Sequence, residues 1–171
     1  MSPAKSAINR KKKVLNKQYI NWRDIETMVA RLLEQIPMDY DNIMVITRGG
    51  MVPACLISEK TNIRNILVAA VMFYEGEQRA TGQPIFLQFP ADSQLQNRKI
   101  LVVDDVWDTG STVMAVCARL HQAQARPEIA VLHYKPGHSL FPDHQPDYFA
   151  EETDAWIVYP WDPERKISEK P

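Results

Sequence analysis

The chain has 171 residues, of which 45% are hydrophobic and 24% charged, and its formal net charge is −1 at pH 7. This length and composition are typical of one soluble globular domain with a sizeable core, and the near-zero charge gives no overall field that would attract nucleic acid. No apolar run reaches the length of a membrane-spanning helix and no apolar segment follows the basic residues near the N-terminus, so we expect a cytoplasmic protein.

The first predicted elements are a tail and a helix. Residues 1–18 are polar and include a basic run at 10–13, a pattern that is typical of a solvated, mobile tail. From Trp22 to Ile36, apolar residues recur at helical spacing. This spacing predicts an amphipathic helix that ends before Pro37, because a proline disfavours helical geometry in the residue before it.

Strands and helices then alternate along the chain. The predicted strands are residues 43–46, 66–73, 100–103 and 129–134, and the predicted helices begin near Pro53 and Ser111. This alternation predicts an α/β fold with a doubly wound, mainly parallel sheet flanked by helices. Because ligands of such sheets bind beyond the carboxyl ends of the strands, the loops after Ile46, Val103 and Tyr134 are candidate ligand loops.

Two segments do not follow this alternation. Residues 74–99 are rich in glycine, proline and polar side chains, so they are predicted to form a long loop that acts as a lid, interrupted by a short strand at 85–89. The chain after Pro136 is rich in proline, aspartate and histidine, and it is predicted to form short strands and turns.

The most informative segment is residues 100–112, where a buried strand leads into acidic residues and then into a Thr-Gly-Ser-Thr turn that opens a helix. The acidic residues are Asp104, Asp105 and Asp108. Backbone N–H groups and the dipole at a helix start suit a phosphate. Carboxylates just upstream suit sugar hydroxyls or a hard cation such as Mg²⁺. The pattern predicts a ligand with a sugar diol and a phosphate, and the alternative is that Ser111 or Thr112 only caps the helix.

This segment resembles the phosphoribosyl pyrophosphate (PRPP) signature of the type I phosphoribosyltransferases. The resemblance implies that Asp104 and Asp105 lie near the ribose hydroxyls and Mg²⁺, with Asp105 as the metal ligand. It implies that Asp108 lies near N7 of a purine, where it would transfer a proton. The residues that it places around the 5′-phosphate are Thr109, Gly110, Ser111 and Thr112. Trp107 departs from the small aliphatic residue that is usual in the family, and it is expected to reshape the pocket mouth.

The loop after Ile46 reads Thr-Arg-Gly-Gly. Its glycines permit close approach of the backbone to a ligand, and Arg48 can donate forked hydrogen bonds to phosphate oxygens. Alone, the loop is more typical of an ordinary turn with a surface arginine. Placed about fifty residues before the PRPP signature, it resembles the family's pyrophosphate loop, which implies that Arg48 and Gly49 contact pyrophosphate. One peptide bond of such loops is often cis.

A third group of residues resembles the base-binding hood of bacterial xanthine-guanine phosphoribosyltransferases. It comprises Lys135-Pro and the later run Trp-Ile-Val-Tyr-Pro-Trp-Asp. The resemblance implies that Lys135 contacts O6 of the purine while Trp156 and Ile157 frame the ring, with Asp162 a lesser candidate. Taken singly, a lysine is usually solvated and a tryptophan usually fills a core. In the lid, Arg79 is implied as a further pyrophosphate contact.

The resemblance covers residues 20–163 and also sets the expected domain boundaries. These are a tail at 1–18, a single domain at 19–163 and a tail at 164–171, the domain containing the lid at about 74–99 and the hood at about 136–163. The expected activity is a purine phosphoribosyltransferase of purine salvage that uses Mg²⁺. It would transfer the phosphoribosyl group from PRPP to guanine, xanthine or hypoxanthine. The expected assembly is a homodimer or homotetramer, with no membrane or nucleic-acid partner.

Two alternatives stay open. A PRPP- or nucleotide-sensing regulatory protein can share this fold, and the basic run at 10–13 is the feature that favours it. An enzyme for pyrimidines or adenine is disfavoured by Lys135 and the hood around Trp156. The glycine patterns of dinucleotide-binding enzymes and of P-loop NTPases are both missing from the sequence.

Overall fold

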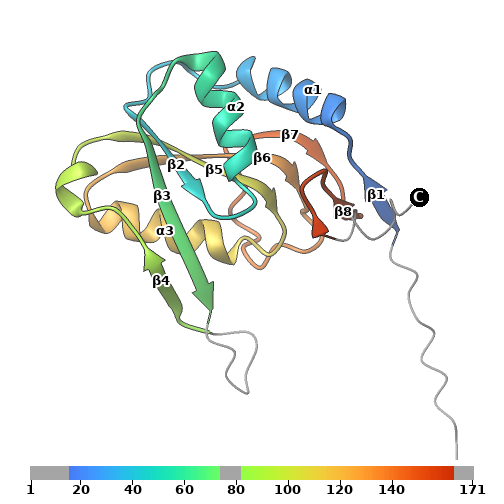
Figure 1. The fold of residues 1–171 in the computed structure, drawn as a ribbon. Helices are drawn as coiled ribbons and strands as arrows, with labels where there is room; N and C mark the ends of the chain where they lie inside the picture. The colour runs from blue at the N-terminus through green and yellow to red at the C-terminus, as the bar shows by residue number, and fades with distance from the viewer. Residues whose placement is uncertain (1–15, 74–81, 164–171) are drawn as a thin grey trace, which may run out of the picture. The chain divides into compact units, whose positions relative to one another are not determined.

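The computed structural model describes residues 16–73 and 82–163 (Figure 1). Arg79, the basic run at 10–13 and the predicted C-terminal tail therefore lie outside the described residues. Within the described ranges, no helix is long and apolar enough to cross a membrane.

The chain divides into two compact units, which are described separately. The smaller unit is Met1–Ile20 with Ala155–Pro171, and the larger unit is Asn21–Asp154. In the smaller unit, strand β1 (Lys17–Tyr19) pairs in parallel with β8 (Trp156–Val158). The sequence analysis did not predict β1, because three residues with mixed polarity are too short to show a period of two.

The larger unit is built on a six-stranded sheet with the strand order β4-β3-β2-β5-β6-β7. Every neighbouring pair is parallel except β3 and β4, which are antiparallel. The strands are β2 (Asn42–Ile46), β3 (Ile66–Phe73), β4 (Pro84–Gln88), β5 (Lys99–Trp107), β6 (Arg126–Tyr134) and β7 (Tyr148–Glu152). The predicted doubly wound, mainly parallel sheet is therefore confirmed.

Helices cover both faces of this sheet. Helices α1 (Trp22–Leu33) and α2 (Met51–Thr61) lie on one face, and α3 (Ser111–Gln122) lies on the other (Figure 1). The central strand β5 carries the apolar run Ile-Leu-Val-Val, each residue of which is fully buried. A continuous apolar run is what a strand covered on both faces requires. Helix α1 begins at a capping box formed by Asn21 and Asp24.

The segment before β5 is more ordered than its composition predicted. Strand β4 extends the sheet as an antiparallel edge strand beside β3. A 3₁₀ turn, η1 (Asp92–Gln94), follows, and Leu95 directly after it is fully buried. The short strand predicted at 85–89 is therefore confirmed as β4, and the predicted loop that follows it contains a 3₁₀ turn that the sequence did not indicate. Residues 74–81 lie outside the described residues.

Candidate functional site

Strand β5 extends beyond the end of its neighbour β2, and the adjacent aspartates lie on this extension. The β2–β5 ladder ends at Val45 and Val103, while the β5–β6 ladder continues from Asp104 opposite Val131 to Trp107. The prediction that the strand ends before the aspartates is therefore wrong, because β6 continues to pair with β5. The aspartates lie at the carboxyl edge of the sheet, beside the point where the chain leaves β2.

The surroundings of Asp104 perturb its carboxyl group. Burial, and then repulsion from the adjacent Asp105, raise the pKa of Asp104 well above its ordinary value of 3.8. Oδ1 of Asp104 also accepts a hydrogen bond from the backbone N–H of Asp105 at 2.9 Å. A carboxyl group held in this way is suited to accept a hydrogen bond from a sugar hydroxyl or to be neutralised by a cation.

The loop from Thr47 to Gly50 lies directly against the acidic pair. The Thr47–Arg48 peptide bond is cis. A Cβ atom on Gly49 would overlap the Asp105 carboxylate, and one on Gly50 would overlap the carbonyl oxygen of Val103. The Arg48 residue is exposed. The structure thus brings the predicted pyrophosphate loop and the predicted ribose carboxylates together, and it shows that this close approach requires glycine.

Helix α3 follows the turn at Thr109 and Gly110 directly, and its N-cap residue makes no side-chain capping hydrogen bond with the described residues. The N-cap residue is Gly110, with φ of 81°, and the helix starts at Ser111. Thr109 Oγ1 accepts a hydrogen bond from the Ser111 backbone N–H at 3.3 Å. The alternative in which Ser111 or Thr112 caps this helix is therefore wrong, since both residues lie within its first turn. A helix start whose N-cap residue has no capping side chain can offer the N–H groups that follow Ser111 to an anion.

Trp107 lies beneath this turn and is fully buried. A Cβ atom on Gly110 would overlap its indole ring. The indole N–H donates to Ser139 Oγ at 3.2 Å, and the ring packs edge-to-face on Tyr134 at 6.1 Å. The expectation that Trp107 reshapes the pocket mouth is therefore wrong: its large apolar ring is in the core and supports the turn from below.

Lys135 and Asp108 come together at the end of β6. Lys135 is 4% exposed, and its Nζ lies 3.5 Å from Oδ1 of Asp108. His138 Nδ1 lies 2.8 Å from the same oxygen. His138 was not among the predicted site residues, although a histidine three residues after a candidate lysine at a strand end is a usable signal.

Of the predicted hood residues, Trp156, Ile157 and Asp162 belong to the smaller unit, whereas Lys135 belongs to the larger unit. Trp156 and Ile157 lie in β8, in register with Lys17 and Gln18 of β1. The Asp162 side chain accepts a hydrogen bond from the Tyr159 backbone N–H at 2.7 Å, which gives it a role in a turn. The contacts of Trp156 and Ile157 with a purine stay predictions.

The acidic pair provides a donor set that fits Mg²⁺. Among the described residues, no cluster of three or more histidine, cysteine or acidic side chains could hold a metal ion. A complete protein cage is not required, because Mg²⁺ is usually held by one or two carboxylates together with water and substrate phosphates. Asp104 and Asp105 supply two carboxyl groups beside a loop suited to phosphate.

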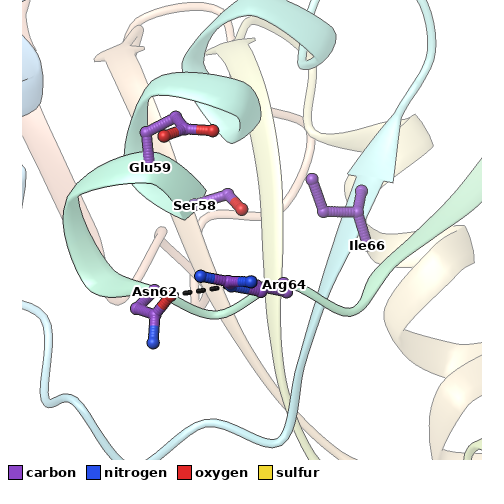
Figure 2. Close-up of a pocket in the computed structure, with 5 residues that line it drawn as sticks. All are labelled: Ser58, Glu59, Asn62, Arg64 and Ile66. Carbon is purple, nitrogen blue, oxygen red and sulfur yellow. Dashed lines mark hydrogen bonds between the residues drawn. The ribbon is translucent and has the colours of Figure 1, made fainter.

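A separate open pocket of about 500 Å³ lies at the C-terminal end of α2 and the start of β3 (Figure 2). It is lined by Ser58, Glu59, Asn62, Arg64 and Ile66. Arg64 Nε donates to Asn62 Oδ1 at 2.9 Å in this pocket. Because Ile66 begins β3, the pocket is at the amino end of the strands, opposite the edge that carries the predicted site residues.

Comparisons with known proteins identify the family of this chain. A family model described as a phosphoribosyl transferase domain matches residues 16–168. A xanthine-guanine phosphoribosyltransferase of Gluconobacter oxydans is 31% identical over 140 residues, which are 82% of this chain and 79% of the relative.

Two solved structures have a similar fold. A purine phosphoribosyltransferase from Pyrococcus horikoshii matches with a TM-score of 0.75 and 30% identity, over 86% of this chain and 95% of that one. A hypothetical protein from Neisseria gonorrhoeae with bound ppGpp matches with a TM-score of 0.75 and 27% identity, over 87% of this chain and 90% of that one.

Proposed function

Because this chain belongs to the phosphoribosyl transferase family, we propose that it is a purine phosphoribosyltransferase of purine salvage that acts on a 6-oxopurine. It takes PRPP and guanine, xanthine or hypoxanthine, and it releases a nucleoside monophosphate and pyrophosphate. The proposal rests on one observation, which is that three loops come together at one edge of the sheet. The 47–50 loop touches Asp105, the turn at 109–112 opens α3, and Lys135 lies beside Asp108. Purine enzymes among its relatives support the substrate class.

In this proposal, PRPP spans the first two loops. Asp104 and Asp105 accept hydrogen bonds from the ribose hydroxyls, and the uncapped start of α3 takes the 5′-phosphate. The groups around that phosphate are the backbone and hydroxyls of Thr109, Gly110, Ser111 and Thr112. Arg48 and the backbone at Gly49 bind the pyrophosphate, and Arg79 adds a further contact from the predicted lid.

The purine lies beside Lys135 and Asp108. A lysine ammonium group has donors and no acceptor, so it favours the O6 carbonyl of a 6-oxopurine over the 6-amino group of adenine. Asp108 accepts the hydrogen bond or the proton of N7. Trp156 stacks on the purine face, and Ile157 frames its edge.

Asp105, assisted by Asp104, holds the Mg²⁺ ion. When bound there, the ion supplies positive charge that neutralises the pyrophosphate leaving group. Its proposed site follows from the two-carboxyl donor set described above and from the phosphate loop next to it.

The transfer forms the bond between C1′ and a purine nitrogen and breaks the bond between C1′ and the pyrophosphate oxygen. Positive charge develops on the ribose ring during this exchange, and Asp104 and Asp105 stabilise it. Negative charge collects on the leaving pyrophosphate, where Arg48 and nearby backbone N–H groups bind it. Asp108 takes the purine proton. The predicted lid excludes water, which would otherwise hydrolyse the activated sugar.

Nucleotide sensing is the second candidate function. The observation that favours it is ppGpp bound to the structural neighbour from Neisseria gonorrhoeae. A sensor would bind PRPP or a nucleotide at the same edge and would not transfer the phosphoribosyl group. The chain is further proposed to be cytoplasmic and to form a homodimer or homotetramer.

The test is pyrophosphate release from PRPP, measured with and without Mg²⁺ and with and without each purine. Release that requires both a 6-oxopurine and Mg²⁺ supports transfer. Pyrophosphate release in the absence of any purine would indicate that the protein hydrolyses PRPP. Binding of PRPP or ppGpp without release under any condition supports the sensor.

A further inference from the structure

We propose that His138 is a positioning residue for the transfer: it holds one oxygen of Asp108 so that the other oxygen is available to the purine. The role rests on the function proposed above. His138 lies outside the family motifs that the sequence contains.

The two carboxylate oxygens of Asp108 have different contacts. Oδ1 receives His138 Nδ1 at 2.8 Å and lies 3.5 Å from Lys135 Nζ. No described residue donates a hydrogen bond to Oδ2 of Asp108. Because an ionised carboxylate only accepts hydrogen bonds, Nδ1 of His138 is the nitrogen that carries the proton in this contact. Oδ1 is thus occupied by protein donors, and Oδ2 keeps its full accepting capacity for a ligand.

The backbone places His138 against Asp108 from several directions. The His138 N–H donates to the Lys135 carbonyl at 3.2 Å, which closes a turn at the end of β6. The Leu140 N–H donates to the Thr109 carbonyl at 3.0 Å. The side chain of Trp107 donates to Ser139 Oγ at 3.2 Å. The two residues that flank Asp108, Trp107 and Thr109, therefore hold the turn that contains His138 in place.

A second set of contacts fixes the other side of this turn. The Gly137 N–H donates to Asp154 Oδ1 at 3.1 Å, and a Cβ atom on Gly137 would crowd the same carboxylate at 2.8 Å. The turn is thus bound at residues on both sides of His138. A side chain that the backbone holds in this way can orient its partner at little entropic cost.

His138 also affects how strongly Asp108 and Lys135 interact with each other. The buried ammonium group of Lys135 and the Asp108 carboxylate form an ion pair at 3.5 Å, and a tighter pair would withdraw both groups from a purine. His138 contacts Oδ1 at the shorter distance, so it provides part of the hydrogen bonding that the carboxylate requires. Asp108 then keeps Oδ2 for N7.

The test compares His138→Ala with His138→Asn, because the amide nitrogen of asparagine can donate from nearly the position of Nδ1. The exposed His121, near the end of α3, supplies the matched control His121→Ala. We expect His138→Ala to lower kcat for hypoxanthine by about ten- to a hundredfold while KM for PRPP changes by less than about threefold. His138→Asn should restore most of kcat, and His121→Ala should match the wild type.

The outcomes separate this role from the proposed function. Wild-type protein that makes no product with any purine would overturn the proposed function and, with it, this role. An active wild type with an equally active His138→Ala variant would overturn the role of His138 alone. Equal losses of kcat in His138→Ala and His138→Asn, or a parallel rise in KM for PRPP, would also overturn it, because they indicate a general disturbance of the fold.

Discussion

Gly49 lies so close to Asp105 that the hydrogen atom on its α-carbon cannot be replaced by a methyl group without overlap with the carboxylate. The two residues come from different loops, one after β2 and one on the extension of β5. Their contact joins the part of the site proposed for pyrophosphate to the part proposed for the ribose and Mg²⁺.

The first prediction concerns this contact. Gly49→Ala should displace either Asp105 or the 47–50 loop, and it should lower kcat/KM for PRPP by about a hundredfold, equivalent to about 2.7 kcal/mol of transition-state stabilisation. Steady-state kinetics with varied PRPP measures this loss, and thermal unfolding checks that the variant is folded. A folded variant with wild-type kcat/KM would show that the close approach has no role in PRPP binding.

The second prediction concerns Asp108. Asp108→Asn keeps the size of the side chain and removes its basicity, so we expect kcat to fall by about a hundredfold or more. KM for PRPP should change little, because the proposed PRPP contacts lie on other residues. Single-turnover rates with saturating PRPP and hypoxanthine measure the effect. Unchanged turnover would refute the assigned proton transfer.

The third prediction concerns base selectivity. Lys135→Met keeps most of the length of the buried side chain and removes its donors, so it should weaken use of 6-oxopurines about ten- to a hundredfold. Use of a purine that lacks the 6-oxo group should not decline further. The exposed Lys60 provides the control Lys60→Met, which should behave as wild type. An equal loss for every base would contradict contact with O6.

The fourth prediction concerns the stability cost of Asp104, whose pKa in the folded chain is raised by burial and by Asp105. Below its ordinary pKa of 3.8, the side chain is protonated in both the folded and the unfolded chain, and it costs nothing. As pH rises, the unfolded chain loses this proton first, so the free energy of unfolding falls until the pH passes the raised folded pKa.

Asp104→Asn should therefore raise the melting temperature at pH 8 in the absence of Mg²⁺ and PRPP, by ~2–4 °C for each kcal/mol gained. The gain should shrink as the pH approaches 4, while activity is lost at every pH. The exposed Asp143 supplies the control Asp143→Asn, which should not shift the melting temperature. A variant less stable than wild type at pH 8 would contradict the cost assigned to Asp104.

Strong periodic patterns made most of the fold predictable. The helix at Trp22–Leu33 and the strand at Ile66–Phe73 were found from their apolar spacing. Strand β1 was missed because it is short, and the extension of β5 was missed because aspartates are rare in strands. Pairing with β6 along the whole length of β5 overrides that preference, and such long-range pairing leaves no local signal in the sequence.

Short motifs predicted some residues of the site, and long-range contacts determine the others. Arg48, Gly49, Asp105 and Lys135 were found from short motifs, and the structure places each of them at the carboxyl edge of the sheet. His138 was missed because its partner, Asp108, is thirty residues away in sequence. The burial of Trp107 was not predicted, because a tryptophan beside a ligand turn can face either the ligand or the core.

The most direct test of the proposed function is identification of the product. The purified full chain would be incubated with PRPP and Mg²⁺ and with guanine, xanthine, hypoxanthine, adenine or uracil in separate reactions, and each product would be read by mass spectrometry. We expect a mononucleotide from at least one 6-oxopurine, none from uracil, and much less from adenine. A chain that binds PRPP but forms no mononucleotide with any of the five bases would contradict the proposed function.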